Sequence, residues 1–240
     1  MKNLNLYIDG KKIDYSKHSD NDKIFLYNIA KEVEDEYKGY ITLAIVDNKL
    51  RELTYEINNG CNVKFLDTTN MDGRRVYNRT IAFIFIMACK EVFNNSKVVI
   101  EHSLSGGLYC DVHLDRDLKE EDVEKIRTKM KEIIKNDYKI EKIITNKKDA
   151  ISIFKSYNME EKAQLLEYKE YDDVKIYKCN GNIDHFYGYM LPSTGYIKIF
   201  DLKLYKNGVI LLGASSKDKT KAEEFVPQPK LANIYREAEE

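Results

Sequence analysis

Within the first 67 residues the spacing of apolar side chains switches between two periods, and this order constrains the fold more than any other feature of the sequence. Apolar and polar residues alternate on both sides of Asp9-Gly10, a strong signal for a two-residue hairpin turn. Helical spacing follows, and then alternation returns. The expected hairpin, helix, second strand pair and last strand cover 4–15, 22–37, 41–46 with 50–57, and 63–66. A small mixed sheet crossed by one helix accommodates this order.

The rest of the chain predicts a second, larger set of strands and helices. The apolar run 80–89 is about half the roughly 20 residues that a bilayer-crossing helix needs, so it indicates a buried helix beginning near Arg74. Strands and helices follow without regular alternation, which predicts an α+β fold with an antiparallel sheet packed by helices. The expected strands are 97–102, 108–114, 175–179, 197–205 and 209–212, the last two joined by Asn207-Gly208, and the expected helices are 115–136, 146–157 and 160–168.

Composition excludes some partners and compartments. Charged residues make up 33% of the 240 residues but almost cancel to a net charge of -1, so no overall field attracts DNA or an anionic membrane. The N-terminus lacks the apolar segment of a signal peptide, and the four cysteines form no Cys-x-x-Cys pair. We therefore expect a cytoplasmic protein with free thiols. The charged stretch 215–240 contains two prolines and predicts a linker.

Two parts of the chain resemble known domains. The order of elements over 1–67, with Ile57-Asn-Asn-Gly60 before the last strand, resembles TGS, the small β-grasp domain at the start of threonyl-tRNA synthetases and of some GTPases and kinases. The stretch 74–214 resembles the editing-type domain that follows TGS in threonyl-tRNA synthetases. That resemblance is carried by 105–116, 119–123 and 184–193, in the same order.

The resemblance implies a zinc site whose ligands are missing here. In the catalytic members of this family one helix supplies two His residues four apart, and a later segment supplies a Cys and, four residues on, a His. The matching positions in this chain are Arg79, Phe83, Phe186 and Met190. An Arg stays protonated at neutral pH and a Phe has no donor atom, so we expect no metal and no catalytic residue of the family type. His102, Cys110, His113 and His185 flank the same segments, and we favour structural roles for them over a new zinc site.

A groove inherited from such a site is the candidate for function. It would bind a small polar ligand, an amino acid, a nucleotide or the end of a tRNA, with tyrosines stacking on a base and Arg79 meeting a phosphate or carboxylate. The candidate residues are Arg79, Tyr109, Asp111, His113, Asp184, His185, Tyr187 and Tyr189. Two alternatives stay open: a purely structural scaffold, and residual deacylation of aminoacyl-tRNA without the zinc site.

A further resemblance concerns the whole protein. The segments 187–196 and 200–205 resemble the N-terminal region of bacterial uridine kinase-like nucleoside kinases, which carry both domains in front of the kinase. This resemblance implies a regulatory region whose partner is its own C-terminal kinase domain, with ATP and Mg²⁺ needed only there. The chain itself has no phosphate-binding loop, since 213–220 lacks the second Gly and the adjacent Lys, so we expect no enzyme activity from these residues alone.

Overall fold

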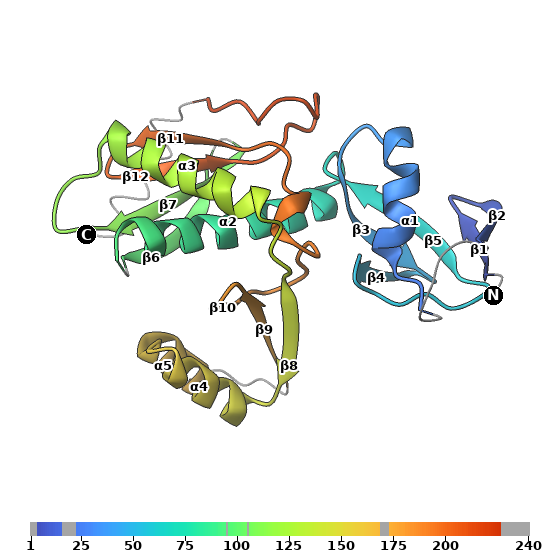
Figure 1. The fold of residues 1–240 in the computed structure, drawn as a ribbon, viewed down its shortest axis with the longest axis horizontal. Coiled ribbons are helices and arrows are strands. Elements are labelled where there is room, and N and C mark those ends of the chain that lie inside the picture. Colours follow the sequence, from blue (N-terminus) through green and yellow to red (C-terminus); the bar gives the residue numbers. More distant parts are fainter. Residues whose placement is uncertain (1–3, 16–22, 95, 105, 169–172, 227–240) are drawn as a thin grey trace.

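The computed structural model describes residues 4–15, 23–94, 96–104, 106–168 and 173–226, and it confirms the α+β class. Three sheets are packed by five α-helices within these residues (Figure 1). The strands are β1 (Leu4–Ile8), β2 (Lys11–Tyr15), β3 (Ile41–Val46), β4 (Lys49–Glu52), β5 (Asn62–Asp67), β6 (Lys97–Leu104), β7 (Gly107–His113), β8 (Glu141–Thr145), β9 (Val174–Cys179), β10 (Asn182–His185), β11 (Asp201–Tyr205) and β12 (Gly208–Leu212). The helices are α1 (Leu26–Val33), α2 (Met71–Val92), α3 (Glu120–Lys135), α4 (Lys147–Ser156) and α5 (Glu160–Glu167), with 3-10 turns at Glu34–Glu36 and Thr194–Tyr196.

The first five strands and α1 form the N-terminal unit. Its sheet has the order β2-β1-β5-β3-β4, in which β1 and β5 are parallel and the other pairs are antiparallel. Both hairpin turns use left-handed backbone, at Asp9 and Gly10 in the first and at Asp47 and Asn48 in the second. Such turns match the right-handed twist of the flanking strands, which is why short polar residues and Gly occupy them. The observed order of elements is the one expected from the hydrophobic pattern.

Helix α2 is the axis of the larger part of the molecule. The Asn70 side chain caps it by accepting the Asp72 N–H at 2.9 Å, and every residue from Thr80 to Cys89 is buried. Helix α3 and the antiparallel sheet β11-β12-β7-β6 pack against α2. A smaller unit lies below α2 in Figure 1, and it consists of the antiparallel sheet β10-β9-β8 with α4 and α5. The expected all-round burial of this helix is therefore observed.

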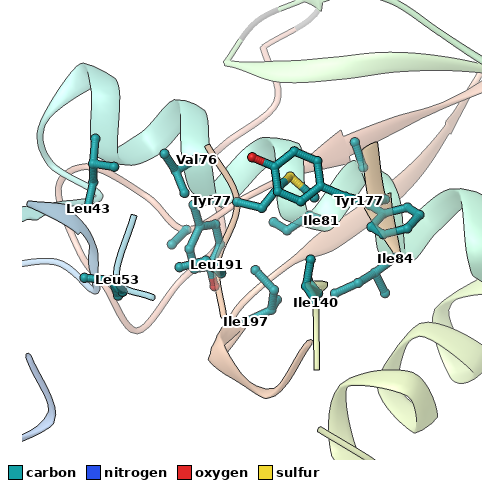
Figure 2. Packing of buried hydrophobic residues seen from close by; sticks show 14 of the residues in the cluster. Leu43, Leu53, Val76, Tyr77, Ile81, Ile84, Ile140, Tyr177, Leu191 and Ile197 are labelled. Atoms are coloured by element: carbon teal, nitrogen blue, oxygen red, sulfur yellow. The ribbon is translucent and has the colours of Figure 1, made fainter. Parts of the chain in front are cut away.

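One hydrophobic core runs through both main parts. A single cluster of buried side chains extends from the N-terminal sheet along α2 to the four-stranded sheet. Figure 2 shows Leu43 and Leu53 at one end of this region and Ile84 and Tyr177 toward the other. The smaller unit has a separate core. Its buried members are Ala150, Phe154, Ala163, Leu166, Val174, Ile176 and Ile183.

Several expected boundaries need correction. Strand β4 ends at Glu52 rather than 57, α3 begins at Glu120 rather than 115, and the strand expected over 197–205 begins only at Asp201. Strands β8 and β10 were not predicted. Both are short and contain several polar residues, so their alternation is weak and their pairing with β9 makes them strands.

The last hairpin turns one residue earlier than predicted. The expected turn was Asn207-Gly208, but Tyr205 pairs with Gly208, so the two loop residues are Lys206 and Asn207. Gly208 is instead a buried strand residue. A Cβ there would lie 2.6 Å from the Cys110 carbonyl oxygen and 2.7 Å from the Tyr109 ring, so this Gly is needed for packing rather than for turning.

The final described residues fold back on the molecule. The Ser215 N–H donates to Lys221 O at 2.9 Å, and the Glu223 N–H donates to Gly213 O at 2.8 Å. Lys219 Nζ donates to Tyr37 O, in the N-terminal unit, at 3.3 Å. Residues 227–240, the remainder of the expected linker, lie outside the described part. None of the described helices is both long and apolar enough to cross a membrane.

Candidate functional site

The four positions that the resemblance sets against zinc ligands lie close together in the structure. Arg79 and Phe83 are one turn apart on α2, while Phe186 and Met190 belong to the segment after β10. The rings of Phe83 and Phe186 meet edge to face with centroids 5.4 Å apart, and the Phe83 and Met190 side chains are almost fully buried. Three of the four positions have therefore become part of an apolar core, since such rings gain from close packing.

Arg79 occupies the fourth position, and its side chain is hydrogen-bonded to the backbone of the segment after β10. Its Nη1 donates to the Tyr189 carbonyl oxygen at 2.7 Å, and its guanidinium lies against Gly188. Gly188 has φ +117°, and a Cβ at this position would lie 2.8 Å from the guanidinium carbon. Burial lowers the pKa of Arg79 from its ordinary value, while the neighbouring Tyr177 and Glu52 favour its charged form. The guanidinium remains a cation, because an Arg is not deprotonated in proteins near neutral pH.

These residues do not fit a zinc ion. Zinc sites in proteins use thiolate, imidazole and carboxylate, and this position offers a cation, two rings and a buried thioether. Across the described ranges no group of three or more His, Cys, Asp or Glu side chains is placed to hold a metal ion. Among the flanking residues considered for a new site, Cys110 is fully buried and His185 Nδ1 lies 2.8 Å from Lys175 O.

The structure distributes the eight candidate groove residues over three neighbourhoods. Arg79 and Tyr189 are joined by the hydrogen bond above. The β7 residues form a second neighbourhood, where His113 Nε2 and Asp111 Oδ2 are 3.2 Å apart and Tyr109 packs near His102. The third consists of Asp184, His185 and Tyr187 beside α5. The eight residues therefore lie in three separate places and do not line one common pocket.

A cleft of about 480 Å³ opens between α2 with β6 and the smaller unit. Its lining residues are Ile86, Lys90, Ser96, Lys97, Val98, Tyr157, Asn158, Met159, Glu160, Glu161 and Lys162. Lys97 pairs with Glu161 at 2.7 Å, whereas Lys90 makes no ion pair or hydrogen bond within the described part of the chain. Burial lowers the pKa of Lys90, and the charge of Asp184 counteracts this effect. The cleft thus contains a half-buried cation without a direct partner.

Asp184 is a buried carboxylate next to this cleft. Lys162, from α5, forms an ion pair with its Oδ1 at 2.5 Å, and the His185 N–H donates to the same oxygen at 2.6 Å. Lys162 also lines a smaller hollow of about 180 Å³, whose other walls are mostly apolar. Those walls are Phe154, Leu165, Leu166, Asp184, His185 and Tyr187. The pair holds opposite charges at the boundary between the two hollows.

The sequence analysis did not include three residues that the structure places at or near these sites: Lys90, Lys162 and Glu52. Lys90 follows Arg79 by eleven residues, or three helical turns, so its place on the same face of α2 was available from the spacing. Lys162 lies in an ordinary charged helix. Glu52 lies in another unit, and nothing in its sequence surroundings distinguishes it from the neighbouring exposed charges.

No protein-family model matches this chain. It is 30% identical over 195 residues to a threonine--tRNA ligase of Caldanaerobacter subterraneus subsp. tengcongensis, covering 81% of this chain and 30% of that protein. It is 28% identical over 190 residues to the threonine--tRNA ligase of Acetivibrio thermocellus, covering 79% of this chain and 30% of the relative. The chain is homologous to a region of threonine--tRNA ligases.

The homology covers about 30% of the length of these relatives. It agrees with the resemblance to threonyl-tRNA synthetases that the motifs indicated. It gives no support to the expected uridine kinase-like parent, because the relatives above carry a different name. The kinase domain, its ATP and its Mg²⁺ therefore stay predictions.

Proposed function

We propose that this chain binds the 3′ end of a tRNA in the cleft between α2 and the smaller unit, as a binding module without the family's zinc-dependent hydrolysis. In this proposal residues 1–67 form a TGS-like unit and 74–214 an editing-like unit. The names of the relatives support tRNA as the class of ligand. The observation that carries the proposal is the Lys90 ammonium, which faces the cleft without a direct partner in the described structure.

The chemistry of the cleft matches a nucleotide. Its volume of about 480 Å³ lies within the range of roughly 300–1,000 Å³ that is usual for small-ligand sites. A half-buried ammonium has already lost part of its hydration on folding. Binding an anion therefore costs little further desolvation of the ammonium and supplies the opposite charge that it lacks. A terminal phosphodiester supplies that anion, and the exposed ring of Tyr157 at the edge of the cleft offers a face on which a base can stack.

Exchange of Lys90 for Gln tests this proposal. We expect K90Q to weaken binding of a fluorescent tRNA transcript about fivefold and to lower the salt dependence by about one released ion, since one phosphate contact is lost. The measurement is an anisotropy titration at several salt concentrations. The matched control is K131Q, which removes an exposed Lys of α3 away from the cleft. Equal affinities for K90Q, K131Q and the parent would refute the proposed site.

Residual deacylation is the second candidate, and the Asp184–Lys162 pair favours it. A buried carboxylate beside a cleft can orient or deprotonate a water, and the adjacent ammonium can stabilise developing negative charge. The expected signature is hydrolysis of aminoacyl-tRNA above background that persists with a chelator and is lost in D184N. An unchanged background rate with the parent protein would eliminate this candidate and leave the binding role in place.

The kinase parent is a separate proposal about the whole protein. The complete gene sequence tests it: a Gly-rich loop ending in Gly-Lys-Ser or Gly-Lys-Thr in that sequence would support a kinase parent. The relatives point instead to an origin in threonine--tRNA ligases. The scaffold role is the outcome to adopt if neither tRNA binding nor deacylation is measured.

A further inference from the structure

The segment 186–191 includes Phe186 and Met190, and its backbone is anchored by hydrogen bonds to the side chains of four residues, Arg79, Thr80, Glu52 and Tyr177. Arg79 Nη1 donates to Tyr189 O at 2.7 Å, and the Leu191 N–H donates to Thr80 Oγ1 at 3.1 Å. Both of these anchors come from α2. The third is different, because the Met190 N–H donates to Glu52 Oε1, at 3.1 Å, in the N-terminal unit.

Glu52 is the last residue of β4, and its side chain is only 5% exposed. Its Oε1 accepts from the Tyr177 hydroxyl at 2.6 Å as well as from Met190, and its Oε2 is paired with Lys142 Nζ. All three of these donors belong to other segments, in β8, in β9 and after β10. A carboxylate so deeply buried is costly unless its charge is paired and its oxygens are bonded, and here every such contact crosses between the two main parts.

Tyr177 and strand β4 also contact segment 186–191 directly. The Tyr177 hydroxyl also lies 2.7 Å from the Gly188 carbonyl oxygen, and its ring packs edge to face near Phe186. The Tyr189 hydroxyl donates to Leu50 O, in β4, at 3.1 Å. The short strand β4 therefore contacts the segment both through the Glu52 carboxylate and through its own backbone.

We propose that Glu52 is the positioning residue of segment 186–191, in which a buried carboxylate from the N-terminal unit fixes the conformation of this segment. Arg79 and Thr80 tie the segment to α2, and Glu52 ties it in addition to β4, β8 and β9. The N-terminal unit is then a structural part of the region around this segment. This inference stands whether or not the cleft binds tRNA.

Hydrogen exchange of single amides, followed by NMR on the full chain, tests this inference. We expect the Met190 amide to exchange about tenfold faster in E52A or more, because its acceptor is removed while the surrounding helices keep theirs. E52Q retains an oxygen acceptor and should recover most of the protection. Y177F, which removes one donor to Glu52, should give a smaller increase than E52A.

Two internal references separate positioning from a general loss of stability. The Leu191 amide is bonded to Thr80, and the amides of α1 lie in the same unit as Glu52, so both should change much less than Met190. E56A is the matched control, since the Glu56 side chain forms an exposed ion pair with Lys23. Unchanged Met190 exchange in E52A would overturn the proposal, as would an equal acceleration at Met190 and throughout α1. If E52A does not fold, Y177F decides the matter: parental exchange at Met190 in Y177F would overturn the proposal, whereas faster exchange confined to Met190 would support it.

Discussion

Gly188 and Arg79 depend on each other at the scale of single residues. The backbone at Gly188 has φ +117°, a conformation that side chains with a Cβ rarely adopt, and its open face is covered by the Arg79 guanidinium. The same guanidinium is bonded to the adjacent Tyr189 carbonyl. The position of Arg79 therefore depends on a Gly at 188, because a Cβ there would meet the guanidinium.

Exchange of Gly188 for Ala should be destabilising in two separable ways. Backbone strain alone costs about 1–3 kcal/mol, and contact with the guanidinium adds to it. G181A is the matched control, because Gly181 also has positive φ but has open space around it. We expect thermal or urea unfolding to show a larger loss for G188A than for G181A. In an R79M background the excess should disappear, and an unchanged excess would contradict the proposed contact.

At the scale of elements, α2 and α3 differ in how they are held. Helix α2 is fixed mainly by burial, while the start of α3 depends on charge. Asp122 accepts from Arg116 at 2.6 and 2.9 Å and from the Lys119 N–H at 3.1 Å. Arg116 and the Lys119 N–H lower the pKa of Asp122 to about 2, so this carboxylate stays charged through the ordinary acidic range.

This pKa predicts the acid dependence of stability. The pKa of Asp122 is depressed in the folded state, so its contribution is present above the unfolded value of about 3.9 and is lost as pH falls toward about 2. We expect the stability difference between the parent and D122N to shrink by about 1 kcal/mol between pH 6 and pH 2, a modest figure because Arg116 is half-exposed. Urea unfolding at several pH values measures it. D115N, at an exposed position nearby, should show no such change, and a constant difference for D122N would contradict the assignment.

At the scale of the whole molecule, the two main parts act as one structure. The buried core is continuous from the N-terminal sheet to the four-stranded sheet, Glu52 joins β4 to the larger part, and Lys219 contacts Tyr37 O. The smaller unit has a core of its own, yet its strands β8 and β9 bond to Glu52 through Lys142 and Tyr177, and the cleft lies where this unit meets α2 and β6. A site at such a junction is sensitive to both neighbours, which is why the Glu52 experiment is performed on the full chain.

The sequence by itself determined the fold class, the order of elements in the N-terminal unit and the burial of α2, because these depend on local periodicity and turn residues. The expectation that Arg79, Phe83, Phe186 and Met190 hold no zinc follows from side-chain chemistry alone, and it stays a prediction. The tertiary structure alone decided that the eight groove candidates separate, that Lys90 faces the cleft, and that Glu52 bonds to Met190. Contacts between residues up to 182 positions apart leave no periodic signal, since they arise only when distant segments pack together.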